Sequence, residues 1–415
     1  MYINKFIKMC GIVGIYTKQD IKKVLYSRLL DLQHRGQDSY GYSDGTITEK
    51  YMGLINVKPQ RIKRNIAIGH TRYRTSGEID KISTQPISRN GITLVHNGNV
   101  HLIHSTSDTH ALLDYIIENK SSDIIETIRY TIDNVEGSFF VLMIYEGCLY
   151  AFKDKNGIRP GCYGKKGDNI IFSSENSRFE DNDIEMIDDV QPGEIIKVDT
   201  EGNLTKHNTE TKYTLKPCIF EYIYLSNPES TIYGLNVKEF RLRMAEKCVK
   251  SLKNMKFDAV CGIPSSSRIY ALEIANLLKV TYFEPMVQKK RSFIMPTQEE
   301  REKYVKNKFR FADHHFNYEN ILIVDDSIVR GTVSKSIITK FKEKRCDITF
   351  LSCSPKILSP NRFGINISSK KELVTYNRTH EQIEEHLGCK IIYQNIDNLY
   401  ECSGFENLEI SKFLH

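Results

Sequence analysis

The stretch ILIVDDSIVRGTVSKSI, residues 321–337, decides the fold of the second half of the chain. It opens with four aliphatic residues, 321–324, which is typical of a strand buried on both faces of a sheet. The acidic pair Asp325 and Asp326 and a short polar turn follow, and aliphatic residues recur at roughly helical spacing from Val333 onward. The stretch therefore predicts a strand, a loop and a helix of an open α/β sheet. Ligands bind in such sheets where loops leave the carboxyl ends of the strands.

The loop between this strand and this helix has the features of a phosphate site. A helix N-terminus presents unpaired N–H groups and a positive dipole end to an anion. Gly331 lets the backbone approach a ligand closely, and Ser327 and Thr332 add hydroxyl donors. Asp325 and Asp326 would repel a phosphate but accept hydrogen bonds from sugar hydroxyls, so the combination indicates a ribose phosphate. The simpler alternative is that the two aspartates only cap the helix.

The string DDSIVRGT, residues 325–332, resembles the signature for 5-phosphoribosyl diphosphate (PRPP) of the type I phosphoribosyltransferases. The resemblance implies a set of PRPP-binding residues: Asp325, Asp326, Ser327, Ile328, Val329, Arg330, Gly331 and Thr332. It also implies Mg²⁺ at the leaving diphosphate, with Ser266, Asp325 and Asp326 as the metal-binding residues.

Two further stretches resemble parts of the same family. Residues 257–278 indicate a buried strand, a serine-rich loop and a helix, and the loop resembles the pyrophosphate loop. Ser266 matches the residue that can reach the metal, whereas Ser265 stands where family members usually carry an acidic residue. Residues 288–298 resemble, in shortened form, the flexible loop that closes over PRPP. Its basic residues are expected to contact the diphosphate, with a solvated basic run as the alternative: Lys289, Lys290 and Arg291.

Four strings in the first half are informative together: MCGIVGI at 9–15, HRGQ at 34–37, GHTRY at 69–73 and HNGN at 96–99. In this order they resemble the class II glutamine amidotransferase domain. The resemblance implies glutamine hydrolysis and an N-terminal-nucleophile fold, in which two stacked antiparallel sheets lie between helices.

The resemblance assigns roles to five residues of this half. Cys10 is the expected nucleophile, and the Asn97 side chain and the Gly98 N–H are expected to form the oxyanion hole. Arg72 is expected to hold the glutamine carboxylate, because a guanidinium fork suits a planar bidentate partner. Asp108 is expected to hold the α-ammonium group. As an alternative, Asn97 and Gly98 are typical of a type I′ hairpin turn, which could itself aim the donors.

Cys10 needs a base, because the thiolate and not the thiol is the nucleophile. In N-terminal-nucleophile enzymes the base is the nucleophile's own free α-amine, whose pKa of about 7.7–8.0 suits proton transfer near neutral pH. A peptide nitrogen has no basic lone pair, so Cys10 must become the first residue. We therefore expect residues 1–9 to be an untranslated segment or a leader that is removed.

Composition limits the class of protein further. The 415 residues are enough for two or three domains, and the net charge of +6 is mild and scattered, so no nucleic-acid partner is expected. No apolar run is long enough to span a membrane, so no membrane partner is expected. Ten cysteines without a CxxC pair or a secretory signal indicate reduced thiols in the cytoplasm.

The predicted fold class is an α+β N-terminal-nucleophile αββα sandwich followed by an α/β type I phosphoribosyltransferase domain with a mainly parallel sheet. The expected boundaries are 10–225 for the glutaminase domain, 226–385 for the phosphoribosyltransferase domain and 386–415 for a short C-terminal segment.

Residues 9–402 as a whole resemble the amidophosphoribosyltransferase family. The resemblance implies that ammonia from glutamine passes internally to C1 of PRPP, displaces diphosphate and gives 5-phosphoribosylamine, the first committed step of purine synthesis. It further implies a homotetramer or homodimer that purine nucleotides inhibit. Two alternatives stay open: another glutamine-dependent amidotransferase, or a non-catalytic protein that senses PRPP or nucleotides.

Some members of this family bind an iron–sulfur cluster through four cysteines. Cys218 matches one of these positions and Cys402 aligns loosely with another, but Asn361 and Leu399 stand at the remaining two. A cubane cluster normally needs four thiolates, so no iron–sulfur cluster is expected.

Overall fold

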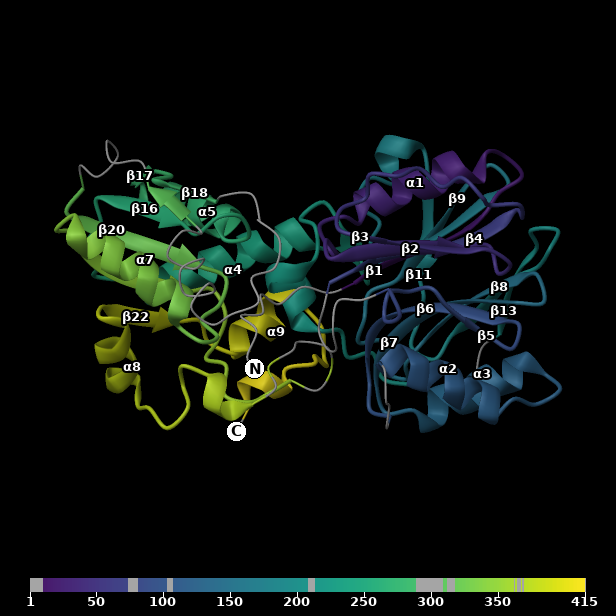
Figure 1. Cartoon of the computed structure of the whole chain (residues 1–415). Coiled ribbons are helices and arrows are strands. Elements are labelled where there is room, and N and C mark those ends of the chain that lie inside the picture. The colour runs from purple at the N-terminus through teal and green to yellow at the C-terminus, as the bar shows by residue number, and fades with distance from the viewer. Residues whose placement is uncertain are drawn as a thin grey trace.

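The computed structural model describes residues 10–73, 81–102, 107–207, 213–288, 309–311, 318–361, 363, 367 and 369–414. The chain forms two domains side by side, with the N-terminal domain on the right and the C-terminal domain on the left in Figure 1. The predictions for residues 1–9 and for Lys289, Lys290 and Arg291 lie outside the described residues.

The N-terminal domain consists of two antiparallel sheets stacked between helices (Figure 1). One sheet has seven strands, in the spatial order β11 (Glu185–Asp189), β9 (Cys162–Lys166), β10 (Asn169–Ser173), β1 (Gly11–Tyr16), β4 (Ile66–Arg72), β2 (Ser39–Ser43) and β3 (Thr48–Met52). The other has six: β13 (Leu204–His207), β12 (Ile195–Val198), β8 (Cys148–Lys153), β7 (Gly137–Tyr145), β6 (Ile92–Val100) and β5 (Ile87–Arg89). The covering helices are α1 (Ile21–Asp31) on the first sheet, and α2 (Asp108–Glu118) and α3 (Ile124–Asn134) on the second. The predicted αββα sandwich is confirmed.

Strand β1 is the middle strand of the seven-stranded sheet, and its side chains are buried on both faces. Ile12 packs between the two sheets with Phe140, whereas Val13 packs against Leu25 of α1 on the outer face. Successive side chains of a strand point to opposite faces, so burial on both faces fixes the register of β1. Cys10, immediately before β1, is therefore attached to one of the most constrained strands of the domain.

The C-terminal domain contains a sheet of five parallel strands, which confirms the predicted mainly parallel sheet. Their spatial order is β17 (Thr281–Tyr282), β16 (Ala259–Gly262), β20 (Asn320–Asp325), β21 (Asp347–Ser352) and β22 (Lys390–Tyr393). The covering helices are α4 (Val237–Ser251) and α5 (Arg268–Leu278) on one face, and α7 (Thr332–Glu343) and α8 (His380–Leu387) on the other.

The aliphatic run at 321–324 is buried on both faces, as predicted. Leu322 and Val324 lie in the core beneath α4 and α5, and Ile321 and Ile323 lie in the core beneath α7 and α8. One strand thus contributes to two hydrophobic cores, which explains why its sequence shows no polar alternation.

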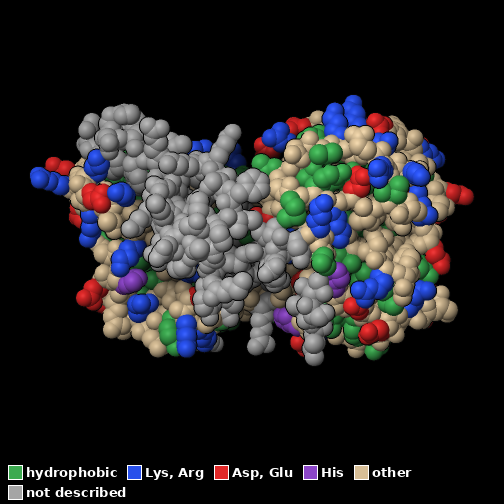
Figure 2. All heavy atoms as spheres, viewed as in Figure 1, with side chains coloured by type: hydrophobic (Ala, Val, Ile, Leu, Met, Phe, Trp, Pro, Cys, Tyr) green, Lys and Arg blue, Asp and Glu red, His purple; other side chains and the backbone are tan. Residues whose placement is uncertain are grey.

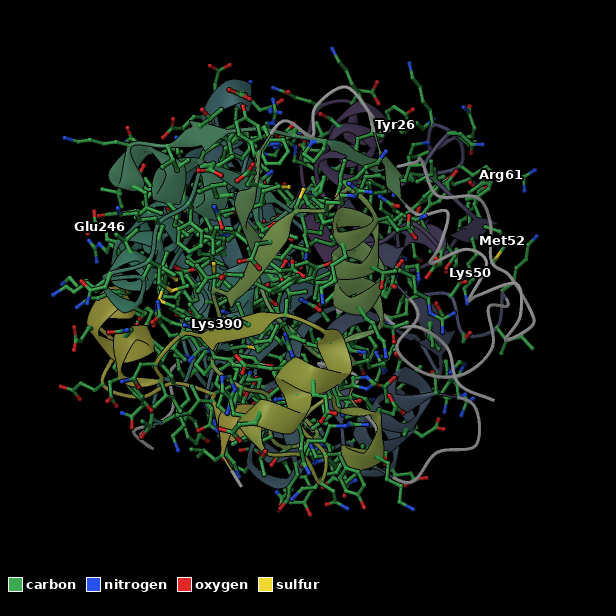
Figure 3. The ribbon with its side chains drawn as sticks, turned by 90° about the vertical axis from the view of Figure 1, so that its left-hand side faces the viewer. Tyr26, Lys50, Met52, Arg61, Glu246 and Lys390 are labelled. Carbon is green, nitrogen blue, oxygen red and sulfur yellow. The ribbon has the colours of Figure 1, made fainter. Side chains whose placement is uncertain are left out.

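Strand β22 lies beyond the domain boundary predicted at residue 385. Four residues are too few to show a clear sequence period, so the pattern did not indicate a strand there. Figure 3 views this end of the molecule, with Lys390 at the start of β22 and Glu246 on the outer side of α4. The remaining short elements are β14 (Thr231–Ile232), β15 (Leu235–Asn236), β18 (Met286–Gln288), β19 (Phe309–Phe311), α9 (Asp397–Ser403), the 3₁₀ helices η1 (Glu180–Asn182), η4 (Lys370–Glu372) and η5 (Ser411–Phe413), and the π-helix η2 (Glu221–Leu225).

Near its C-terminus the chain packs against the segment that joins the two domains. Cys218 and Glu409 form a parallel β-bridge, and the rings of Phe220 and Phe413 stack with centroids 5.7 Å apart. The buried Lys412 ammonium lies 2.8 Å from the Glu409 carboxylate. Burial alone would raise the pKa of Glu409, but Lys412 outweighs it and lowers that pKa to about 2. A buried ion pair therefore holds the C-terminal segment in place.

The described helices include none that is long and apolar enough to cross a membrane. On the face shown in Figure 2, basic and acidic side chains are interspersed over the described surface.

Replacing Glu409 by glutamine should destabilise the protein in a pH-dependent way. A carboxyl group whose pKa is lowered by folding stabilises the folded state above its ordinary pKa, and this contribution disappears as the pH falls toward the folded value. The free energy of unfolding of Glu409→Gln should therefore be about 3 kcal/mol below that of the natural protein at pH 7, and the difference should shrink between about pH 4.5 and pH 2.

The chain has no tryptophan, so urea unfolding is best followed by far-UV circular dichroism. The exposed residue Glu406 supplies a matched control, Glu406→Gln, which should leave the unfolding midpoint unchanged. An equal loss in both variants would contradict the assigned role of the ion pair.

Candidate active sites

The strand order of the parallel sheet defines a ligand-binding crevice. The chain passes from β16 to its neighbour β17 on one side and then returns to β20 on the other side of β16. The loops that follow β16 and β20 therefore leave the sheet in opposite directions, and the crevice between them is where open α/β sheets bind ligands. These are the two loops whose sequences resemble the pyrophosphate loop and the PRPP signature.

A hydrogen bond joins the two loops at the crevice. The Ser266 hydroxyl, after β16, donates to Asp326, after β20. Ser327 Oγ donates to Asp326 Oδ1 at 2.8 Å, and the Asp326 N–H donates to Asp325 Oδ1 at 2.9 Å. The structure thus brings the predicted residues Ser266, Asp325 and Asp326 together, from positions about sixty residues apart in the sequence.

Gly331 connects this loop to helix α7, which begins at Thr332, one residue before the first position of the predicted helical pattern. Its φ of 75° lies in the left-handed region, and a Cβ there would lie 2.9 Å from a methyl carbon of Val374. Both conditions favour glycine. The loop between β20 and α7 therefore keeps the tight form that a helix N-terminal anion site requires.

Two side chains of the predicted PRPP set are directed elsewhere. Ile328 is buried in the core beneath α7, so only its backbone could meet a ligand. Arg330 Nε donates to Glu372 Oε2 at 3.0 Å, and the Val374 N–H donates to the Val329 carbonyl at 2.9 Å. Residues 372–374 thus support the loop from behind, a contact that the sequence did not indicate.

Cys10 directly precedes β1, and β1 pairs with β4, the strand that ends at Arg72. Its thiol donates to the Tyr73 carbonyl at 3.7 Å, and the adjacent residue Gly11 pairs with Thr71 of β4. Burial raises the pKa of the Cys10 thiol, while the Tyr73 hydrogen bond and the charge of Arg72 act in the opposite direction. A thiol in this environment needs a base to become a nucleophile, as expected from the sequence.

Arg72 directly precedes Tyr73, whose carbonyl accepts from the Cys10 thiol, and the charges of Arg72 and Asp108 both act on the pKa of that thiol. Arg72 is the last residue of β4, and one of its terminal nitrogens donates to Ser83 Oγ at 2.7 Å. Asp108 begins α2, and its Oδ2 lies 3.5 Å from His96 Nε2. A cation and an anion whose charges both act on a nucleophile suit the two charged ends of an amino acid.

Asn97 and Gly98 lie within strand β6, so the alternative interpretation as a hairpin turn is wrong. Gly98 pairs with Phe139 of β7, and a Cβ on Gly98 would lie only 1.9 Å from the Ser138 carbonyl oxygen. This close approach excludes a side chain. Asn97 is fully buried, and within the described part of the chain both polar atoms of its amide are without a hydrogen-bond partner. A buried amide that is not otherwise satisfied is available to stabilise a developing oxyanion.

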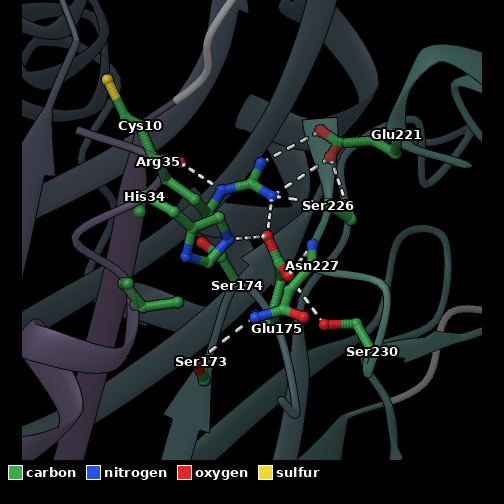
Figure 4. A network of polar contacts seen from close by, with 12 residues as sticks. Cys10, His34, Arg35, Ser173, Ser174, Glu175, Glu221, Ser226, Asn227 and Ser230 are labelled. Atoms are coloured by element: carbon green, nitrogen blue, oxygen red, sulfur yellow. Dashed lines mark hydrogen bonds and ion pairs between the residues drawn. The ribbon is translucent and has the colours of Figure 1, made fainter. Parts of the chain in front are cut away.

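Sequence reasoning missed an ionic network behind Cys10 (Figure 4). The fully buried Arg35 donates from Nε to the Cys10 carbonyl at 2.9 Å, and its terminal nitrogens contact Glu175 and Glu221. Arg159 also contacts Glu221, at 3.1 Å. Arginine and glutamate are seldom fully buried unless they are paired, but the sequence alone does not show which residues pair.

Two metal groups can be tested against the side chains present. Carboxylate and hydroxyl oxygens of Asp325, Asp326 and Ser266 fit Mg²⁺, which commonly binds one or two carboxylates together with substrate phosphates. The surroundings of Cys218 do not fit an iron–sulfur cluster, because Lys412 Nζ lies 3.8 Å from its sulfur and Asn361 donates to Glu409 beside it. The described residues contain no group of three or more His, Cys, Asp or Glu side chains that could hold a metal by itself.

Comparisons with known proteins cover both domains. A family model described as a glutamine amidotransferase domain matches residues 9–193. The chain is 33% identical to the amidophosphoribosyltransferase of Pseudomonas aeruginosa, over 98% of this chain and 91% of the relative. It is 31% identical to that of Methanocaldococcus jannaschii, over 96% of this chain and 95% of the relative.

Solved structures agree with the sequence relatives. The structure of glutamine PRPP amidotransferase from B. subtilis, complexed with ADP and GMP, matches with a TM-score of 0.84 at 28% identity, over 97% of this chain and 94% of that chain. A structure described as the allosteric regulatory enzyme of purine biosynthesis matches with a TM-score of 0.83. Because the similarity runs through both domains, it does not support an amidotransferase that shares only the first. The chain therefore belongs to the amidophosphoribosyltransferase family, and is a transferase of purine biosynthesis with a glutamine amidotransferase domain.

Proposed function

We propose that this enzyme hydrolyses glutamine at Cys10 and transfers the released ammonia to C1 of PRPP bound at the carboxyl ends of β16 and β20. The products are 5-phosphoribosylamine, glutamate and diphosphate. The observation that carries the assignment of the PRPP site is the hydrogen bond from Ser266 to Asp326, which joins the two loops of the crevice.

In the glutamine site, each candidate residue has a chemical role. The Cys10 thiolate attacks the amide carbon, and the resulting oxyanion accepts hydrogen bonds from the Asn97 amide and the Gly98 N–H. Collapse of this intermediate releases ammonia and leaves a thioester, which water hydrolyses to glutamate. Arg72 holds the substrate carboxylate, and Asp108 holds its α-ammonium group.

The nucleophile becomes active when Cys10 is the first residue of the mature chain. Its free α-amine then accepts the thiol proton and later delivers a proton to the leaving ammonia. This step requires the removal of residues 1–9, or translation that starts at Met9 followed by loss of the methionine. The mass of the active protein checks the point directly.

In the PRPP site, the loop between β20 and α7 binds the 5-phosphate, and the aspartates bind the ribose. The N–H groups at the start of α7 and the hydroxyls of Ser327 and Thr332 face the phosphate. Asp325 and Asp326 accept hydrogen bonds from the ribose hydroxyls. When bound, Mg²⁺ supplies charge neutralisation for the departing diphosphate, with Ser266 and the two aspartates as its protein partners.

The enzyme is also proposed to bind purine nucleotides at the PRPP site, to form a homotetramer or homodimer and to work in the cytoplasm. The B. subtilis structure with ADP and GMP supports the first proposal, since the likeness extends over 97% of this chain. All ten cysteines lie within the described residues and are free thiols, as is usual in a reducing compartment.

Replacing Cys10 by alanine should separate the two activities. Glutamine-dependent release of diphosphate from PRPP and Mg²⁺ should fall at least about 10³-fold, because no other group can form the thioester. Release with ammonium in place of glutamine should persist. A control variant, Cys148→Ala, changes another partly exposed thiol and should retain both activities. Equal activity of Cys10→Ala with glutamine would contradict the mechanism, and no release by the natural protein with either nitrogen source would favour the non-catalytic sensor.

Replacing Asn97 by alanine should slow glutamine hydrolysis about 10²- to 10³-fold, because one oxyanion donor is lost. The KM for glutamine should change little, since Arg72 and Asp108 bind the ends of the substrate. The measurement is glutamate formation in steady state. A rise in KM without a fall in kcat would instead assign Asn97 to substrate binding.

Replacing Asp326 by asparagine should reduce diphosphate release with both glutamine and ammonium by on the order of 10²-fold, because a hydrogen bond to a charged group contributes about 1.5–3 kcal/mol. Asp347, exposed at the opposite end of the same sheet, provides the control Asp347→Asn, which should behave like the natural protein. Unchanged PRPP turnover in Asp326→Asn would contradict the proposed position of the ribose.

A further inference from the structure

The backbone of Cys10 is held by a side chain whose own partners come from both parts of the molecule. Arg35 Nε donates to the Cys10 carbonyl at 2.9 Å. The two terminal nitrogens of Arg35 donate to the two carboxylate oxygens of Glu221, each at 3.1 Å, in a bidentate pair (Figure 4). Bidentate pairing fixes the plane of a guanidinium as well as its position. The orientation of the nitrogen that holds Cys10 therefore depends on Glu221.

Glu221 lies outside the region that matches the glutamine amidotransferase family, which ends at residue 193. It begins the π-helix Glu221–Leu225 in the segment that joins the two domains. This segment is fixed to the C-terminal domain, because Arg241 of α4 donates to the Tyr222 carbonyl at 2.8 Å and Tyr270 of α5 donates to the Ile223 carbonyl at 3.0 Å. The carboxylate that orients Arg35 is thus attached to the other domain.

A second arginine, Arg159, links Glu221 to β7, the strand that pairs with the Asn97–Gly98 region of β6. Arg159 donates to Glu221 at 3.1 Å and also donates to the Phe363 carbonyl of the C-terminal domain. Ser138 Oγ donates to the same carbonyl at 2.8 Å, and Ser138 is the strand neighbour of Asn99 in β6. Glu221 therefore lies between an arginine that holds the backbone of Cys10 and an arginine that contacts Ser138 of β7, the strand paired with β6.

The charges of this cluster balance only when Glu221 is ionised. Arg35 and Arg159 are two buried cations, and Glu175 and Glu221 are two buried anions. Burial works against ionisation of Glu221, but Arg35 and Arg159 outweigh it and keep its pKa below the ordinary value. Glu175 is additionally held by the Asn227 N–H at 2.8 Å and the Ser230 hydroxyl at 2.7 Å, so it cannot turn to replace Glu221.

We infer that Glu221 is a positioning residue of the glutamine site. Through Arg35 it holds the backbone of Cys10, so the segment that joins the two domains is part of what makes the glutamine site active. The inference deepens the proposed function, because it rests on Cys10 being the nucleophile. Glutamine hydrolysis then depends on the position of a segment that the phosphoribosyl domain holds.

The variant Glu221→Gln tests the inference, because it keeps the shape of the side chain and removes its charge. The kcat for glutamine-dependent diphosphate release should fall about 30- to 100-fold, as expected for a reacting group displaced by about 1 Å. The KM for glutamine should stay within threefold, since Arg72 and Asp108 are not altered. Ammonium-dependent release should stay within twofold. Labelling of Cys10 by an electrophilic glutamine analogue should slow by the same factor as kcat.

Two companion variants make the test specific. Glu229 lies on the same segment with an exposed side chain, so Glu229→Gln should retain every activity. Arg35→Lys keeps the positive charge but lacks the planar fork, so it should reproduce the kcat defect of Glu221→Gln. If Glu221→Gln does not fold, Arg35→Lys provides the same comparison between glutamine and ammonium.

Two results would overturn the inference. Full glutamine-dependent activity in Glu221→Gln would show that Cys10 does not depend on Glu221. An equal loss of glutamine-dependent and ammonium-dependent diphosphate release, together with a lower unfolding temperature, would show that Glu221 has a purely structural role. Failure of the natural protein itself to use glutamine would instead contradict the proposed function, so the two proposals fail in distinguishable ways.

Discussion

Both domains depend on one carboxylate that two buried arginines share. Removing Glu221, Arg35 and Arg159 from water is costly, and their mutual attraction repays this only while every partner is present. Such a cluster contributes little net stability but strongly disfavours any arrangement in which one member is missing. The segment that carries Glu221 is therefore fixed relative to β1, and the two sites keep a defined relation although they belong to separate hydrophobic cores.

The two halves use opposite sheet architectures to build their sites. In the N-terminal domain, antiparallel strands stacked as a sandwich place Cys10 at the end of β1 and a buried amide within β6. In the C-terminal domain, parallel strands direct all their carboxyl ends to one edge, and the reversal of strand order beside β16 opens the crevice there. An acyl-transfer site needs rigid, water-excluded donors, whereas a phosphate site needs converging N–H groups at a helix start.

The surroundings of Cys218 contain an ion pair and not the further thiolates that an iron–sulfur cluster needs. Around Cys218, an ammonium and a carboxylate are buried together, with Asn361 as a further donor. These groups hold Glu409 and Phe413 against the joint, where the C-terminal segment packs on Phe220. The ion pair can hold the segment there because Lys412 and Glu409 neutralise each other's charge in a buried environment.

Local sequence pattern was enough to predict the doubly buried strand at 321–324, the loop from Asp325 to Thr332, and the family. It also predicted Cys10, Arg72 and Asp108 as one set, and the charges of Arg72 and Asp108 both act on the pKa of the Cys10 thiol. That Asn97 and Gly98 lie in a strand became clear from the fold alone, because their partner strand β7 lies about forty residues further along the chain. The fold likewise shows that Arg330 pairs with Glu372 and Arg35 with Glu221. Periodicity and motif chemistry are properties of neighbouring residues, whereas a buried charge acquires its partner only when distant segments close around it.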